Sequence, residues 1–225
     1  MVELRESKYA GVYTDNRDFF TPAFGRGVNV YGEKLISHSG KQFRRWDPHR
    51  SKLAALMHKG CPTWPFTRKT EVLYLGAAGG TTASHISDLC VEGRLYCIEI
   101  SPTVFRKLLE VSSTRPNMLP FLGDADKPET FRHLLSSFDV LYQDIAQRDQ
   151  VSIFLKNLGP LRPGGIGFLM LKARSVDVSE EPEELYRESV RELSIQGYKV
   201  LVSKPLNPFE KDHAAIVVQR PSGQA

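Results

Sequence analysis

The sequence reads VLYLGAAGGTT over residues 72–82, and this stretch decides the fold class. Its first four residues are apolar, which is typical of a short buried strand, and the glycines that follow favour a tight turn into a helix. Glycines let the backbone of such a loop approach a ligand, and a helix N-terminus offers free N–H groups. The loop matches neither G-x-G-x-x-G nor a Walker A motif. A plain structural turn would fit it too, so it indicates only a candidate site.

Strands and helices alternate from this stretch onward. The further strands are predicted at residues 95–98, 118–122, 140–142, 166–172, 198–203 and 214–219. The helices are predicted at residues 81–90, from Pro102 after a Ser101 cap, and at 128–135, 150–158 and 180–195. Such alternation is typical of an α/β protein with a mostly parallel sheet, whereas two final strands without a helix between them require an antiparallel hairpin. We therefore predict a Rossmann-like sheet of seven strands, the last one antiparallel, an ending that fits a class I methyltransferase sheet better than a dehydrogenase sheet.

The N-terminal region has a different pattern. Its short alternating runs, separated by turn residues, predict small hairpins. These runs are residues 11–13, 27–31 and 42–46. Residues 51–59 predict a short helix, and the prolines of residues 60–70 indicate a linker. We predict a small β-rich N-terminal domain over residues 1–56, ending in the short helix, and a methyltransferase domain over residues 57–225.

Composition limits the class of protein. The chain has 225 residues, 41% hydrophobic and 25% charged, as in a globular protein with a substantial core. No apolar run approaches the roughly 20 residues of a membrane span, and the N-terminus does not resemble a signal peptide. The cysteines Cys61, Cys90 and Cys97 form no CxxC pair, so we expect neither a disulfide framework nor a metal site. These features predict a cytoplasmic protein with no membrane partner.

The net charge of +4 is mildly basic and permits a nucleic-acid partner. Eight basic and two acidic residues lie within residues 26–59, with Tyr31, Phe43 and Trp46 among them. A basic surface with interleaved aromatic rings can contact phosphates and bases. A solvated face fits the same composition, so charge alone leaves this question open.

Two acidic residues follow the next two predicted strands and point to the ligand. Glu99 lies 19 residues after Gly80, about where an acid binds a ribose hydroxyl pair in such sheets. Asp124 follows the third strand, where it can accept a hydrogen bond from an adenine amino group. Together with Gly76 and Ala78 of the loop, these residues predict a site for an adenosine-bearing cofactor.

The fourth and fifth strands end in Asp144 and Lys172. Both strand tips would face the same cleft, which suggests a charged pair around a reacting hydroxyl. We hypothesise that Asp144 accepts a proton from that hydroxyl while Lys172 orients it and lowers its pKa. An ordinary surface ion pair would give the same pattern.

Several longer motifs resemble the fibrillarin family, in particular the archaeal fibrillarin-like 2′-O-methyltransferases. These motifs are YLGAAGGTTASH (74–85), DIAQ (144–147), RSKLAA (50–55), KARS (172–175), EKDHA (210–214), GVY (11–13) and VYGE (30–33). They occur in the family's order and cover essentially the whole chain. Gly79 departs from the family pattern, which has Ser in the loop, and this puts one side-chain hydrogen bond in doubt.

The resemblance implies particular site residues. It implies a catalytic set of Lys52, Asp144, Lys172 and His213. It implies cofactor contacts at Thr81, Thr82, Glu99, Ile100, Asp124, Ala125, Asp144, Ile145, Ala146 and Gln147, with S-adenosylmethionine as the cofactor. For Lys52 and His213 the resemblance is the main argument, because a solvated helix lysine and a structural histidine fit the local sequence as well.

The resemblance also implies an activity and partners. The expected reaction is guide-RNA-directed 2′-O-methylation of ribosomal RNA, and of transfer RNA in some archaea. The expected assembly is a box C/D ribonucleoprotein with a guide RNA, a Nop-domain scaffold protein that binds directly, and a kink-turn-binding ribosomal-type protein. Three alternatives are a nicotinamide-dependent oxidoreductase, a non-catalytic RNA-binding subunit, and a methyltransferase that acts on a protein glutamine. The missing G-x-G-x-x-G motif argues against the first, and the intact Asp144, Lys172 and His213 against the second.

Overall fold

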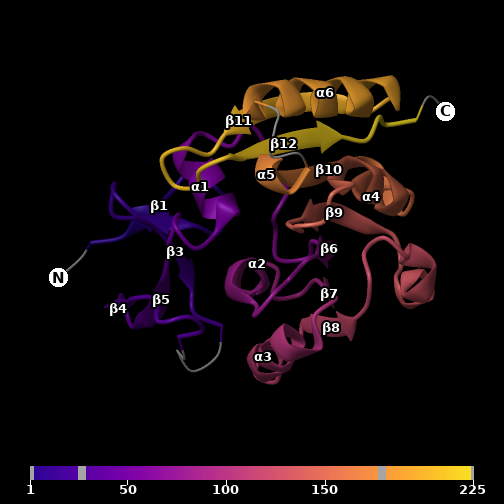
Figure 1. The fold of residues 1–225 in the computed structure, drawn as a ribbon. Helices are drawn as coiled ribbons and strands as arrows, with labels where there is room; N and C mark the ends of the chain where they lie inside the picture. The colour runs from indigo at the N-terminus through magenta and orange to yellow at the C-terminus, as the bar shows by residue number, and fades with distance from the viewer. Residues whose placement is uncertain (1–2, 25–28, 177–180, 224–225) are drawn as a thin grey trace.

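The larger of two sheets has seven strands in the order β11-β12-β10-β9-β6-β7-β8 (Figure 1). We describe it from a computed structural model, which covers residues 3–24, 29–176 and 181–223. The strands are β6 (Val72–Leu75), β7 (Leu95–Glu99), β8 (Met118–Leu122), β9 (Phe138–Gln143), β10 (Leu161–Lys172), β11 (Lys199–Pro205) and β12 (His213–Gln219). β12 runs antiparallel to both β10 and β11, and the other pairs are parallel. The predicted seven-stranded sheet with an antiparallel last strand is confirmed.

Helices cover both faces of this sheet. The helices are α1 (Lys52–His58), α2 (Thr81–Leu89), α3 (Pro102–Ser112), α4 (Gln150–Asn157), α5 (Ala173–Val176) and α6 (Pro182–Ile195). One core cluster joins α1, α2 and α3 to the sheet, and a second joins α4, α5 and α6 to its other face. Val72 and Tyr74 enter the first cluster while Leu73 and Leu75 enter the second, as the pleat of a strand requires. All four residues are apolar because both faces are covered.

The second sheet is antiparallel and has five short strands in the order β1-β2-β3-β5-β4. They are β1 (Arg5–Glu6), β2 (Tyr13–Thr14), β3 (Phe19–Pro22), β4 (Leu35–His38) and β5 (Lys41–Trp46). The strand predicted at 27–31 is wrong for residues 29–31, and residues 27 and 28 lie outside the described residues. The N–H groups of Val30 and Tyr31 donate to the Glu33 carboxylate at 2.9 Å instead of pairing in a ladder. The pattern also missed β1, β3 and β4, which are too short to show clear alternation.

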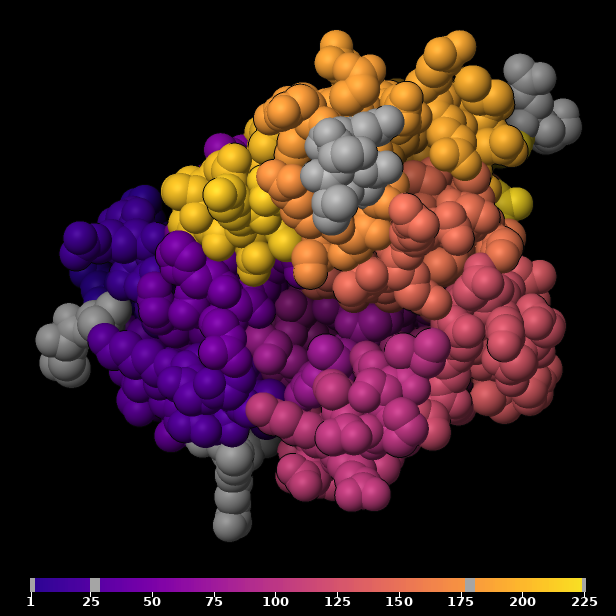
Figure 2. All heavy atoms as spheres, in the orientation of Figure 1, coloured from indigo at the N-terminus to yellow at the C-terminus, as the bar shows by residue number. Residues whose placement is uncertain are grey.

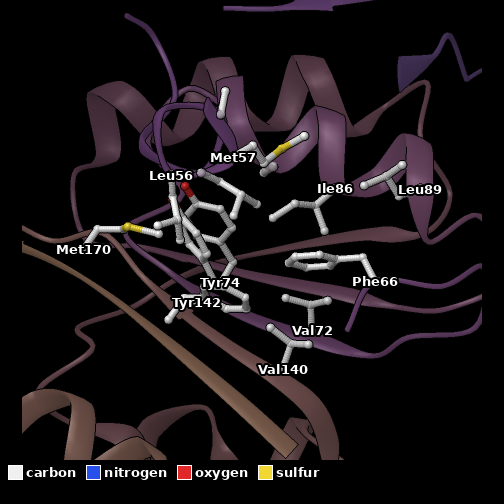
Figure 3. Close-up of a cluster of buried hydrophobic side chains, with 14 of the residues drawn as sticks. Leu56, Met57, Phe66, Val72, Tyr74, Ile86, Leu89, Val140, Tyr142 and Met170 are labelled. Carbon is white, nitrogen blue, oxygen red and sulfur yellow. The ribbon is translucent and has the colours of Figure 1, made fainter. Parts of the chain in front are cut away.

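The two sheets share one core. Side chains of α1 pack with those of β6, α2 and β9, and Figure 3 shows Leu56 and Met57 beside Tyr74, Tyr142 and the neighbouring apolar groups. The predicted boundary between residues 56 and 57 falls inside α1. The division into two domains therefore stays a prediction.

A buried ionic network also joins the small sheet to α2. The guanidinium of Arg44 lies 2.7 Å from Glu33 and 2.6 Å from Asp88, and none of these three side chains is exposed. Arg115 binds the other carboxylate oxygen of Asp88 at 2.6 Å. Nearby, His85 is held between two hydroxyl groups, and burial keeps its pKa well below the ordinary value. This network anchors the helix that carries the glycine-rich loop at its start.

Three other segments differ from the prediction. Residues 128–135 form two short 3₁₀ helices, η1 (Pro128–Thr130) and η2 (Arg132–Leu134), in place of one α-helix. β10 includes the predicted turn at 162–165. Its register against β9 shifts there, but the N–H of Gly164 donates to the carbonyl of Arg220 just after β12, so the chain stays in the sheet. α6 begins at Pro182, while the predicted start at residue 180 lies outside the described residues. Within the described ranges, none of the helices has the length and apolar character of a membrane span.

Candidate functional site

A cavity of about 380 Å³ lies where β6, β7, β8 and β9 end. In the view of Figure 2 a hollow opens at the middle of this face, between magenta, coral and orange segments. The lining residues are Gly76, Ala78, Ile98, Glu99, Ile100, Gly123, Ala125, Asp144, Ile145, Ala146 and Gln147. Ligands of open α/β sheets bind at this edge, so the cavity is the candidate cofactor site.

Gly76 brings two walls of the cavity into contact. Its φ is +77°, and a Cβ atom there would lie 2.2 Å from the carbonyl oxygen of Asp144. The N–H of Asp144 donates to the carbonyl of Leu75 at 2.9 Å, so the loop after β6 and the end of β9 are joined through their backbones. Only glycine permits both this conformation and this approach.

Glu99 is buried at the end of β7, and backbone groups hold its carboxylate in place. The N–H of Ala78 donates to Oε2 at 2.9 Å, and the N–H of Ser101 donates to Oε1 at 2.8 Å. Each carboxylate oxygen can accept more than one hydrogen bond. Glu99 can therefore accept from a pair of ribose hydroxyls while its backbone bonds keep it fixed.

Nine of the twelve predicted cofactor residues line the cavity, and Thr81, Thr82 and Asp124 do not. The hydroxyl of Thr82 is buried and donates to Ser51 at 2.9 Å. Asp124 lies next to the cavity, where its carboxylate accepts from the Gln147 side chain at 3.3 Å. The roles of these three residues stay predictions.

Lys52 and Asp144 form the most direct contact among the four predicted catalytic residues. The Nζ atom of Lys52 lies 2.8 Å from Oδ1 and 3.0 Å from Oδ2 of Asp144. Lys52 is the first residue of α1, and Asp144 follows β9 and lines the cavity. Their side chains are 16% and 22% exposed, so the pair lies at the mouth of the pocket and not deep in the core.

His213 and Lys172 stand opposite each other on β12 and β10. The Nδ1 atom of His213 lies 2.7 Å from the carbonyl oxygen of Lys211. Burial lowers the pKa of His213 from its ordinary value of 6.5, and the positive charge of Lys52 lowers it further, whereas Glu210 and Asp144 raise it. The structure thus brings the four residues together beside the cavity. Asp144 lines the cavity and pairs with Lys52, both lie near His213, and His213 stands opposite Lys172.

Two buried tyrosines lie beneath this group. The rings of Tyr74 and Tyr142 are 4.6 Å apart, and both belong to the core cluster of Figure 3. Burial raises the pKa of each phenol well above its ordinary value, and the nearby charge of Asp144 raises it further. Both phenols are therefore neutral near pH 7 and do not supply a base.

Sequence reasoning missed several residues that hold the site. Ser51 caps α1 and accepts hydrogen bonds from the Trp46 indole and the Thr82 hydroxyl, both at 2.9 Å. A serine before a helix that begins at Lys52 is a recognisable cap signal. Gln143, the last residue of β9, and Gln150, the first residue of α4, are buried and polar. No local pattern in the sequence distinguishes them. Among the residues that the structure describes, no group of three or more His, Cys, Asp or Glu could hold a metal ion.

Comparison with known proteins relates this geometry to one family. The Fibrillarin family model matches residues 4–222. A fibrillarin-like rRNA/tRNA 2′-O-methyltransferase of Methanothermobacter thermautotrophicus is 44% identical, over 93% of this chain and 94% of the relative. The crystal structure of Aeropyrum pernix fibrillarin with natively bound S-adenosyl-L-methionine is 41% identical, with a TM-score of 0.87 over 97% of this chain and all of that one. The fibrillarin of a fibrillarin/Nop5p complex is 36% identical, with a TM-score of 0.88 over 96% of this chain and all of that one.

Proposed function

The chain belongs to the fibrillarin family, and from this premise we propose that it transfers a methyl group from S-adenosylmethionine to a ribose 2′-hydroxyl of RNA. The observation that carries the proposal is the double role of Asp144. Asp144 lines the cofactor cavity, and the ammonium of Lys52 holds its carboxylate at 2.8 Å. A proton acceptor at the edge of a methyl-donor pocket is what alkylation of a hydroxyl requires.

The cavity residues fit S-adenosylmethionine. The carboxylate of Glu99 can accept from ribose hydroxyls, and the left-handed Gly76 lets the loop after β6 close against the end of β9 at the cavity wall. Ile100 is 55% exposed at the cavity wall, where it can cover the face of an adenine ring. The bound cofactor supplies a methyl group on a sulfonium, which is electrophilic enough to alkylate an oxygen.

Lys52, Asp144, Lys172 and His213 divide the work on the acceptor. Asp144 accepts the proton of the ribose 2′-hydroxyl as the oxygen forms its bond to the methyl group. Lys52 holds the Asp144 carboxylate through two contacts. Lys172 orients the hydroxyl, and its positive charge lowers the pKa of that hydroxyl. His213 is neutral near pH 7 because burial lowers its pKa, so it can donate or accept a hydrogen bond at the acceptor.

We propose that a guide RNA selects the nucleotide in ribosomal RNA, and also in transfer RNA, within a box C/D particle. The relative's name and the Nop5p complex support an RNA acceptor and a Nop-domain scaffold that binds directly. A kink-turn-binding ribosomal-type protein belongs to the same proposal, as does a cytoplasmic location. The net charge of +4 is modest, so guide pairing and partner proteins would supply most of the RNA affinity.

The test is methyl transfer to a guide-paired RNA in a reconstituted particle, with a labelled methyl donor. We expect Asp144→Ala and Lys172→Ala each to lower turnover by about 10²-fold or more, since positioned acid–base and charged groups contribute that much. Glu92→Ala is the control, because Glu92 pairs with Arg68 on the surface. Near wild-type turnover in both site variants would refute the mechanism, and binding of NAD in preference to S-adenosylmethionine would refute the cofactor.

A further inference from the structure

Lys172 is held by its backbone and not by its side chain. Its ammonium has no ion-pair partner within residues 3–24, 29–176 and 181–223. β9 ends at Gln143, which pairs with Leu169, so β10 runs three residues beyond its parallel neighbour. The backbone N–H and carbonyl of Lys172 point to the side where β9 has already ended, so they have no strand there to bind.

The side chain of Gln150 takes the place of that strand. Its Oε1 accepts from the N–H of Lys172 at 3.0 Å, and its Nε2 donates to the carbonyl of Lys172 at 3.1 Å. One amide thus satisfies both backbone groups of one residue. Gln150 is only 1% exposed, so neither bond competes with water.

A second glutamine fixes Gln150 itself. Nε2 of Gln143 donates to the backbone carbonyl of Gln150 at 2.7 Å. Gln143 is fully buried and directly precedes Asp144. The two glutamines therefore form a short chain of hydrogen bonds from the strand end that carries Asp144 to the backbone of Lys172.

These bonds also settle which way Lys172 faces His213. The N–H and carbonyl of Lys172 point toward Gln150, away from β12, so Lys172 and His213 are a non-hydrogen-bonded pair. Opposed side chains are closest in pairs of this kind. The N–H of the next residue, Ala173, donates to Asp212 at 3.0 Å, which is consistent with that register.

We propose that Gln150, held by Gln143, is the positioning residue that directs the Lys172 side chain toward the acceptor hydroxyl. This inference rests on the proposed function for its effect on turnover. The hydrogen-bonding part concerns this chain alone, so it can be measured without RNA.

The main test is Gln150→Met, which keeps the length of the side chain and removes both bonds to Lys172. In the reconstituted particle we expect kcat to fall about tenfold or more, since small displacements of a catalytic group are costly, while the Kd of S-adenosylmethionine changes by less than about twofold. The rise of kcat with pH should also shift to higher pH, because a displaced Lys172 charge favours loss of the acceptor proton less. In the free protein, the Lys172 amide should exchange its hydrogen faster.

The matched control is Asn117→Leu. Asn117 is also a buried amide. Its Nδ2 donates to the backbone carbonyls of Ser87 and Cys90, at 2.9 and 3.0 Å, at the C-terminal end of α2. We expect Asn117→Leu to lower the urea midpoint of unfolding about as much as Gln150→Met does, but to leave the pH dependence of kcat unchanged. The proposal is overturned if Gln150→Met keeps wild-type kcat and pH profile, or if it loses activity only as Asn117→Leu does.

Two further outcomes are also decisive. If Gln150→Met does not fold, Gln143→Met is tested in its place. Oε1 of Gln143 is buried without a hydrogen-bond partner, so removing this amide should cost less stability. Faster exchange of the Lys172 amide with a lower kcat supports the proposal, and no change in either overturns it. If the wild-type particle does not methylate RNA, the proposed function fails, while unchanged Lys172 exchange in Gln150→Met refutes the positioning role separately.

Discussion

The cofactor pocket and the group of Lys52, Asp144, Lys172 and His213 meet at Asp144, but they are built in different ways. The pocket lies between loops at the ends of adjacent strands, and its walls are joined by backbone bonds such as that from the Asp144 N–H to the Leu75 carbonyl. The charged group consists of side chains from α1, the end of β9, β10 and β12. Lys52 and Asp144 alone are 92 residues apart in sequence.

This difference has an energetic consequence. A pocket whose walls touch through their backbones is sensitive to added volume at that contact. A group made of side chains is sensitive to removal of one member, since Lys52 and Asp144 come from different elements and hold each other. The following changes test this contrast, from the largest expected effect to the smallest.

Gly76→Ala should do the most damage to the pocket. The added Cβ would lie 2.2 Å from the Asp144 carbonyl oxygen, and a φ of +77° strains any L-residue. We expect a loss of about 3 kcal/mol in unfolding free energy by urea titration, and no measurable cofactor binding by calorimetry. Gly40→Ala is the control, because Gly40 has a φ of +75° with nothing within 4 Å of the added atom. If the two variants are equally mild, the two walls do not depend on close contact.

Lys52→Met should damage the charged group and spare the pocket. Asp144 would lose the ammonium that holds both of its oxygens. We expect turnover to fall about 10²-fold, as for a misplaced catalytic group, with cofactor affinity unchanged within about twofold. Lys156→Met provides the comparison, because Lys156 pairs with Asp126 on the surface at 2.6 Å. A large loss of cofactor binding in Lys52→Met would mean that the two parts of the site are not separable.

The pKa of His213 measures the same group more finely. Lys52→Met should raise it and Asp144→Asn should lower it further, since these charges act on it in opposite directions. NMR titration of the imidazole protons would show both shifts, and identical pKa values in the two variants would contradict the arrangement. Because the folded pKa lies below the unfolded value of 6.5, the unfolded chain binds this proton first as pH falls. The contribution of His213 to stability is therefore complete above pH 6.5 and is lost below it.

Gly79→Ser should have the smallest effect. An added Cβ would lie 3.0 Å from Cδ of Lys107, a flexible side chain that can move aside, and no left-handed φ is involved. We expect cofactor affinity within about twofold of wild type and a change in stability under about 0.5 kcal/mol. A larger loss, measured by the same calorimetry and urea titration, would show that the loop has less room than its backbone indicates.

The pocket was also the part that the sequence could predict. A strand, its loop and the next helix are continuous in sequence, and parallel strands end at one edge of a sheet, so Gly76, Glu99 and Asp144 follow from local pattern and strand order. Errors occurred where local pattern is weak, as in the short strands β1, β3 and β4 and the β10 segment that stays in the sheet around Gly164.

The charged group depends on packing between distant elements. The resemblance to fibrillarin identified Lys52 and His213, but their local sequence fits a solvated lysine and a structural histidine equally well. Lys52 reaches Asp144 because α1 packs on β6 and β9 through Leu56, Met57 and their neighbours (Figure 3). Gln150 can bind both backbone groups of Lys172 because β9 ends three residues before β10. Hydrophobic periodicity does not predict this difference between the strand ends. Sequence alone determined the sheet and the edge where the cofactor binds, because these follow from local pattern and strand order. Only the tertiary structure decided which side chains meet there, because those contacts depend on how whole elements pack.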